Sequence, residues 1–139
     1  MNYPEPGMPD LRLVLSEEAT NDQPEAPELL ELRGVKKRAA EIILEAAEVL
    51  RRNDIPVQDD LTAETITAKL KDVPKNGQVE ITISPLSIDG IRAHLMMLGE
   101  KARFTISFHG EIGDARNPER RRIAKILKDA GIHLQQELV

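Results

Sequence analysis

The chain of 139 residues contains no cysteine, and its only aromatic residues are Tyr3, Phe104 and Phe108. Without cysteine the protein has no disulfide, no thiolate metal site and no cysteine nucleophile. Its core must therefore be built from Leu, Ile, Val, Ala and Met. No apolar run is long enough to span a bilayer, and no basic segment followed by an apolar one indicates a general secretory signal. A cytoplasmic protein fits these absences.

Motifs for common catalytic and binding chemistry are absent as well. None of the three histidines, His94, His109 and His133, belongs to a metal-binding motif. The sequence has neither the G-x-S-x-G of serine hydrolases nor the glycine-rich motifs of nucleotide sites. We therefore expect no catalytic residue, no metal site and no cofactor, and we interpret the chain as a non-enzyme.

Charge is unevenly distributed along the chain, whose formal net charge is −5. Residues 1–31 carry eight acidic side chains and one basic, whereas residues 91–139 carry nine basic and six acidic. The net charge does not point to nucleic acid or an anionic membrane as the partner of the whole chain. An acidic N-terminal tail serves solubility on one interpretation and binds a partner on the other.

The tail is predicted to be disordered. Residues 1–28 contain five of the nine prolines and are polar and acidic, a composition that does not support a packed core. The exception is the apolar run at residues 11–15, which suits a strand or a partner anchor as well as a loose tail.

Two helices are predicted before the sheet. In residues 29–53 apolar side chains recur every three or four positions and charged ones fill the opposite side, with Gly34 as a candidate break. This wide stripe suits packing on a sheet or pairing with a second copy. A linker at residues 53–60 follows. Asp60 is expected to cap a second, short helix that ends before the turn signal at residues 76–77.

The hydrophobic period then changes from 3.6 to 2. Alternating apolar residues predict strands at residues 79–84, 91–98 and 102–108. The short loop that contains Gly99 predicts that the second and third strands form an antiparallel hairpin. One face of this sheet is apolar, so helices must cover it.

The chain ends with a helix and a strand. Asn117 is a predicted cap, with Pro118 at the first helical position and Glu119 in the first turn, and Gly131 is the predicted stop. Three apolar residues then predict a last strand, which we expect to enter the sheet through a crossover connection: Ile132, Leu134 and Leu138. The predicted fold class is α+β, two helices followed by a β-β-β-α-β unit, mostly antiparallel with helices on one face, and its domain spans residues 61–139.

Residues 61–139 resemble a known family. The segment Val79-Glu80-Ile81-Thr82-Ile83-Ser84-Pro85 looks like the strand-then-proline opening of the C-terminal domain of flagellar hook-length control proteins, which the needle-length regulators of type III secretion share. The family continues with a hydrophobic-Gly pair, V-x-V-x-L, A-x-V-x-F and L-x-x-x-G-hydrophobic-x-L. The corresponding residues here are Ile88, Asp89, Ile91, Ala93, Leu95, Ala102, Phe104, Ile106, Leu127, Gly131, Ile132 and Leu134.

The resemblance implies a function. Such domains are non-enzymatic, dock on the type III export apparatus, contact the cytoplasmic domain of its switch protein and change which substrates are exported. Asp89 departs from the family, which usually has glycine there, and the family's long ruler region is missing. The implied role is therefore that of the substrate-specificity switch domain, acting in the cytoplasm, with export of the chain itself by a type III system left open.

Exposed loops carry most binding residues, and two loops are the candidates here. The expected partner contacts are Leu86, Ile88, Asp89, Gly90, Arg116, Arg120 and Arg121. Basic residues gather around the second loop and the helix after it, and we call them the basic cluster: Arg116, Arg120, Arg121, Arg122, Lys125 and Lys128. The cluster suits contact with a phosphate or an acidic partner on one interpretation and is a solvated helix face on the other, which we favour slightly.

Two other functions stay open. The segment from Phe104 to Gly110 also looks like a strand of the C-terminal domain of bacterial translation initiation factor three, which would imply RNA or ribosome binding and a βαβα order of elements. A structural subunit that dimerises through residues 35–50 is the third interpretation. The oligomeric state and the identity of the partner do not follow from the sequence.

Overall fold

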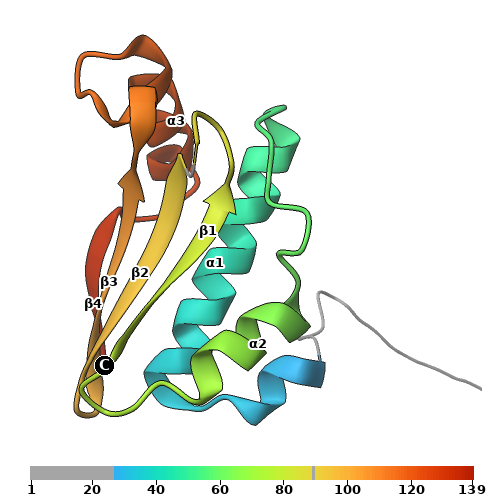
Figure 1. The fold of residues 1–139 in the computed structure, drawn as a ribbon, viewed down its shortest axis with the longest axis vertical. Coiled ribbons are helices and arrows are strands. Elements are labelled where there is room, and N and C mark those ends of the chain that lie inside the picture. Colours follow the sequence, from blue (N-terminus) through green and yellow to red (C-terminus); the bar gives the residue numbers. More distant parts are fainter. Residues whose placement is uncertain (1–26, 89) are drawn as a thin grey trace, which may run out of the picture.

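The computed structural model describes residues 27–88 and 90–139 (Figure 1). The predicted tail at residues 1–28 therefore falls almost entirely outside the described residues, and Asp89 does so too. The elements, in chain order, are η2 (Pro27–Glu31), α1 (Gly34–Arg52), α2 (Ala63–Lys71), β1 (Gln78–Ser84), β2 (Ile91–Leu98), β3 (Lys101–Phe108), η3 (Gly110–Gly113), α3 (Pro118–Asp129) and β4 (Gln135–Leu138).

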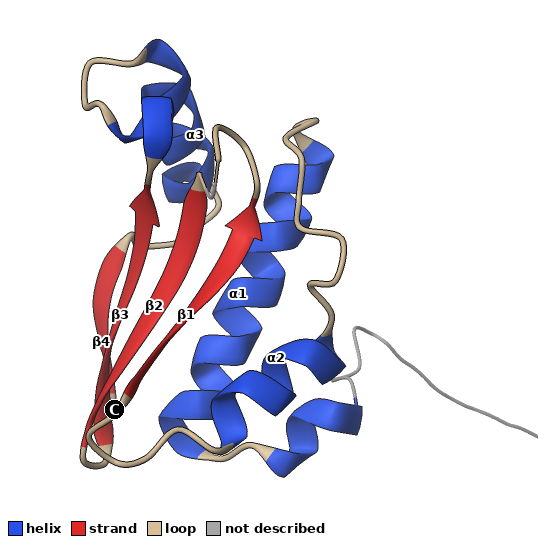
Figure 2. Ribbon diagram, viewed as in Figure 1, coloured by secondary structure: helices blue, strands red, loops and turns tan. Residues whose placement is uncertain are grey.

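The four strands form one antiparallel sheet in the order β1-β2-β3-β4, so the predicted α+β class is confirmed. Figure 2 shows α1 running along this sheet, with α3 near the end where β1 and β3 stop. The predicted hairpin joins Leu98 to Lys101 through a two-residue turn, in which Gly99 has a φ of 71°. A positive φ of this kind suits glycine, which has no Cβ.

The expected crossover connection to the last strand is wrong. β4 is the antiparallel neighbour of β3, with Thr105 opposite Gln135 and Ala102 opposite Leu138. The reason is the position of α3, which lies near the end of the sheet where β3 stops, so the chain re-enters the sheet in the direction opposite to β3 (Figure 1). Gly131, with a φ of 84°, ends α3, and the Ile132 amide then donates to the Leu127 carbonyl, 2.9 Å away, which turns the chain back along β3.

The period-two pattern sorts the strand side chains between two faces. In β2, Ile91, Ala93, Leu95 and Met97 are buried, whereas the alternate residues stay partly or fully exposed. β3 follows the same rule, and its Phe104 is fully buried. Because a slip of one residue would exchange the two faces, burial of the apolar side fixes the register of the strands.

Helix α1 supplies the largest helical share of the core. Nine of its 19 residues are buried. The predicted break falls at Gly34, whose φ of 58° separates η2 from α1. One cluster of buried apolar residues runs from Leu29 to Leu138 and includes α1 and the sheet. The apolar stripe of α1 is therefore used within the chain itself.

Helix α2 begins later than predicted. Its cap is Thr62, whose hydroxyl accepts a hydrogen bond from the Thr65 amide at 3.2 Å, so the assignment of Asp60 as the cap is wrong. At the other end, the Lys36 ammonium of α1 donates to the Lys71 and Val73 carbonyls, at 3.1 and 2.7 Å. This lysine ties α1 to the end of α2, where free carbonyls favour a cation.

We expect the Ile43→Ala variant to lower the free energy of unfolding of the full chain by about 2–5 kcal/mol, because the Ile43 side chain is 1% exposed and its truncation leaves a cavity. The matched control is Glu45→Ala on the exposed side of the same helix, which should change it by no more than about 0.5 kcal/mol. Urea denaturation followed by circular dichroism measures both. Equal losses in the two variants would mean that α1 does not belong to the cooperative core.

Candidate functional site

The predicted contact residues of the two loops lie at one end of the sheet. We call this region the loop end and define it as residues 85–90 and 109–122. It contains the β1–β2 loop, η3 and the first turns of α3, near the point where β1 and β3 stop (Figure 1). Of the predicted contacts, all except Asp89 are among the described residues: Leu86, Ile88, Gly90, Arg116, Arg120 and Arg121.

Hydrogen bonds join the two loops. The His109 amide donates to the Gly90 carbonyl at 2.6 Å, which extends the β2–β3 ladder by one pair. The Glu111 amide donates to the Ser87 hydroxyl at 2.8 Å, across 24 residues of sequence. Inside the first loop, the fully buried Ser84 accepts the Leu86 amide at 3.2 Å. The β1–β2 loop is therefore tied to η3 by the Ser87 hydroxyl and to the end of β3 by the Gly90 carbonyl, whereas Ser84 orders the loop from within.

Two glycines allow these segments to approach closely. A Cβ on Gly110 would overlap the Ser87 carbonyl oxygen of the other loop, and a Cβ on Gly90 would overlap the Leu86 carbonyl oxygen of its own loop. No side chain fits at either position. Gly110 also has a φ of 70°, a conformation that glycine adopts without strain.

The tip of the β1–β2 loop is strained. Ser87 and Ile88 both have positive φ, 58° and 52°, although neither is glycine. For a β-branched residue this conformation is rare and costs about 1–3 kcal/mol. The Ile88 side chain is nevertheless 84% exposed, so burial in the chain's own core does not offset the cost. Such strain persists only where the surroundings enforce it, and it clusters at functional sites.

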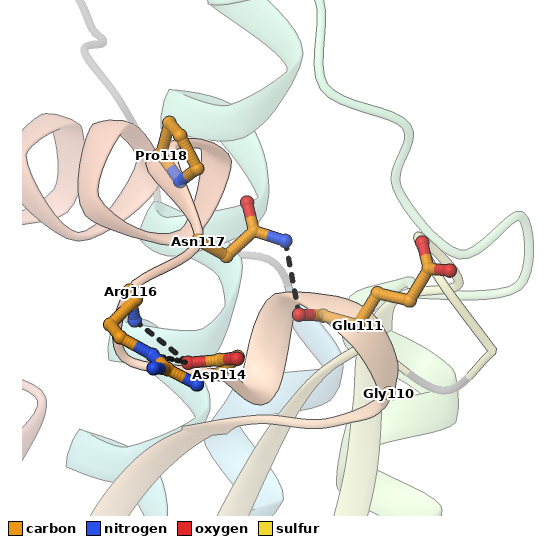
Figure 3. Close-up of a pocket in the computed structure, with 6 residues that line it drawn as sticks. All are labelled: Gly110, Glu111, Asp114, Arg116, Asn117 and Pro118. Carbon is orange, nitrogen blue, oxygen red and sulfur yellow. Dashed lines mark hydrogen bonds and ion pairs between the residues drawn. The ribbon is translucent and has the colours of Figure 1, made fainter.

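The second loop is ordered around Asn117. Its side-chain oxygen accepts the Glu119 amide at 2.8 Å, which confirms the predicted helix cap, and its side-chain nitrogen donates to the Glu111 carbonyl at 3.0 Å (Figure 3). One amide group thus joins η3 to α3. A shallow depression opens here, lined by Gly110, Glu111, Asp114, Arg116, Asn117 and Pro118.

The depression offers little acid–base chemistry. The pKa of the Asp114 carboxyl lies below its usual value because the Arg116 amide donates to it at 2.9 Å and the Arg116 guanidinium does so at 3.4 Å. Asp114 and Arg116 are both exposed. An exposed carboxylate that is already ionised and paired at neutral pH is poorly suited to act as a general base or acid.

Most arginines of the loop end already have partners. The Arg122 guanidinium bonds both oxygens of Glu119, at 3.1 and 2.6 Å, which lowers the pKa of Glu119 and raises that of Arg122. Arg121 donates to the Arg116 carbonyl at 3.3 Å. Arg120 instead lies over the Phe108 ring, with its guanidinium carbon 5.0 Å from the ring centroid. The basic cluster is therefore largely a set of local pairs rather than an open cationic surface.

The histidines make local contacts. The Nε2 atom of His109 lies 2.8 Å from the Ser107 hydroxyl, and that of His94 lies 2.6 Å from the Gln78 side-chain oxygen. Within residues 27–88 and 90–139, no group of three or more His, Asp or Glu side chains is placed to hold a metal ion. None of the helices that the structure describes is both long enough and apolar enough to cross a membrane.

Sequence reasoning missed three parts of the site. The sequence gives no sign that the Ser87 hydroxyl joins the two loops, because a single serine in a turn can form many different hydrogen bonds. The stacking of Arg120 on Phe108 joins two elements whose proximity appears only in the fold. The need for glycine at position 110 had a partial signal in the turn that follows β3.

We expect Gly110→Ala to destabilise the full chain more than Gly99→Ala. The two glycines have nearly the same φ, 70° and 71°, but only Gly110 has a neighbour where the Cβ would lie. Gly99→Ala should therefore lower the free energy of unfolding by about 1–2 kcal/mol, the cost of placing an alanine in the left-handed conformation. Gly110→Ala should lower it by a further amount of about 1–3 kcal/mol because the new Cβ overlaps Ser87. Thermal unfolding of both variants measures the difference, and equal costs would contradict the close approach of the two loops.

Comparisons with known proteins complete the description of the site. No family model, no curated protein and no solved structure gives a significant match to this chain. The functional conclusion is therefore drawn from the loop end itself and from the resemblance noted in the sequence.

Proposed function

We propose that this chain is a non-enzymatic, protein-binding regulatory module that contacts its partner through the loop end. The observation that carries the proposal is Ile88, an apolar side chain that is 84% exposed on a strained backbone. Two hydrogen bonds and two close glycine contacts hold the segment around it. Evolution of a stable fold alone would favour a polar residue or glycine at such a position.

The geometry suits binding for an energetic reason. Full burial of an isoleucine side chain in a partner's pocket releases about 1.5–3 kcal/mol. Because the loop is already ordered against η3, little conformational entropy is lost when the partner arrives. Binding hot spots are side chains that fill a desolvated pocket of the partner and are surrounded by contacts that exclude water.

The resemblance suggests which partner this is. The described elements follow the order of the switch domain of hook- and needle-length control proteins: a short helix, a strand closed by proline, a hairpin, and a helix ended by glycine and an apolar residue. On this basis the proposed partner is the cytoplasmic domain of the switch protein of a type III export apparatus. The proposed effect of binding is a change in which substrates are exported, and the proposed place of action is the cytoplasm.

The two alternatives receive less support. The translation-factor interpretation requires a helix between the first two strands, whereas β1 and β2 are joined only by residues 85–90. An RNA-binding surface would also need free cations, and the loop end has mainly paired ones. The dimer interpretation relied on the apolar stripe at residues 35–50, which α1 buries in the chain's own core.

We expect Ile88→Ser to weaken binding of the full chain to the purified cytoplasmic domain of the export switch protein by about 10- to 100-fold, the equivalent of the lost burial of one isoleucine. Isothermal titration calorimetry measures the affinity. The matched control is Leu98→Ser, because Leu98 is also exposed (42%) but lies at the hairpin turn at the opposite end of the sheet. This variant should bind as the wild type does.

Two results would overturn the proposal. The first is equal affinity of the wild type and the Ile88→Ser variant, which would remove the loop end as the contact. The second is no binding of the wild type to the switch-protein domain, which would remove the proposed partner. Thermal unfolding of each variant must first show that it is folded, and Ile88→Ser is expected to pass because its side chain contributes little to the core.

A further inference from the structure

Arg120 is the one arginine of the loop end for which the described residues offer neither a carboxylate nor a carbonyl partner. Arg116 pairs with Asp114, Arg122 with Glu119, and Arg121 with a backbone carbonyl. The Arg120 guanidinium instead lies over the face of the Phe108 ring. A guanidinium without an acceptor next to three satisfied ones calls for an explanation, since buried or half-buried polar groups are normally hydrogen-bonded.

Stacking fixes the position of this guanidinium. Phe108 is the last residue of β3, pairs with Ile91 of β2 and packs against the core, so its ring is a rigid support. Attraction between the cation and the ring contributes about 0.5–1 kcal/mol at an exposed site and more when water is excluded. A planar guanidinium held in this way loses little further freedom when it binds a carboxylate in two-point fashion.

One side of the group is closed and the other is open. The Nε atom of Arg120 is buried and has no hydrogen-bond partner in the described part of the chain. The two terminal nitrogens have no acceptor among residues 27–88 and 90–139 either, but they are not among the buried atoms without a partner, so they reach the surface. These two terminal nitrogens are therefore the donors from which another molecule can accept.

The location links Arg120 to Ile88. Phe108, which supports Arg120, precedes His109, and the His109 amide is bonded to the Gly90 carbonyl, two residues from Ile88. An apolar side chain and a guanidinium without an acceptor are thus both presented by the loop end. The acceptor is a single carboxylate rather than a polyanion, because three of the four arginines in residues 109–122 are already bonded to acceptors within the chain, which leaves one guanidinium for an external acid.

We propose that Arg120 binds a carboxylate on the partner protein, an Asp or Glu side chain at the rim of the apolar pocket that receives Ile88. The proposal rests on the proposed function for the existence of a protein partner, and it adds the chemistry that the partner must present. Arg120 selects partners with a suitably placed acid, and Ile88 supplies the apolar contact.

A small carboxylate tests the site without the partner. In the full-length chain labelled with ¹⁵N, the side-chain Nε–H signal of Arg120 is recorded at low ionic strength during titration with millimolar 4-methylpentanoate, and then with the uncharged 4-methylpentanamide. We expect a saturable shift of the Arg120 signal with the acid and none with the amide. The internal control is Arg122, whose signal should not move because Glu119 already occupies it. Equal effects of acid and amide, equal shifts at both arginines, or no shift would overturn the proposal.

A second arm uses the partner and separates the two proposals. Arg120→Gln should weaken binding to the cytoplasmic domain of the export switch protein about tenfold, and added salt should reduce the difference. If Ile88→Ser weakens binding and Arg120→Gln does not, the proposed function holds and the carboxylate contact is wrong. If the switch-protein domain does not bind but the Arg120 signal responds to the acid alone, the partner is wrong and the carboxylate site holds.

Discussion

The apolar face of the sheet must be covered, and its burial beneath α1 determines the register of the strands and the position of the loops. Because strand side chains alternate, burial of Ile91, Leu95 and Phe104 leaves only one register for β2 and β3. That register places Gly90 opposite His109, beyond the last ladder pair. The loop before β2 and the loop after β3 therefore lie next to each other. The loop end is thus a consequence of core packing and not an independent assembly.

Where the loops meet, the chain contains features that its core lacks, namely strained backbone and an exposed apolar side chain. Glycine at positions 90 and 110 allows backbone segments to lie in contact. The neighbouring residues Ser87 and Ile88 adopt left-handed conformations, which are strained for residues other than glycine. The strained, exposed apolar tip is held by a rigid sheet, and in proteins generally rigid elements position the loops that bind. The same arrangement keeps Arg120 still, because its support is the last residue of β3.

The sequence predicted the parts of the fold that rest on periodicity. The strand pattern, the hairpin at Gly99, the Asn117 cap and the Gly131 stop each follow from a local rule, and each is present. The errors arose where a local rule had competitors. Asp60 and Thr62 are both acceptable caps by residue type, and the structure uses Thr62, which follows the buried Leu61. The path of the last strand depends on where α3 sits, which no local pattern contains.

The candidate site shows the same limit. Loop exposure was enough to single out Ile88, Gly90 and the arginines, because turns can be read from sequence. Their mutual contacts could not be read, since hydrogen bonds such as that between Glu111 and Ser87 join residues far apart in the chain. Which arginine lacks an acceptor is likewise a property of the assembled loop end.

Amide hydrogen exchange of the full chain without any partner tests the central claim, that the two loops are joined before binding. The account predicts that the Glu111 amide exchanges slowly in the wild type and rapidly in Ser87→Ala, whereas the His109 amide, which bonds the Gly90 carbonyl, stays protected in both. Exchange of the wild-type Glu111 amide at the rate of an unstructured peptide would contradict it, because the loop that presents Ile88 would then not be held in place.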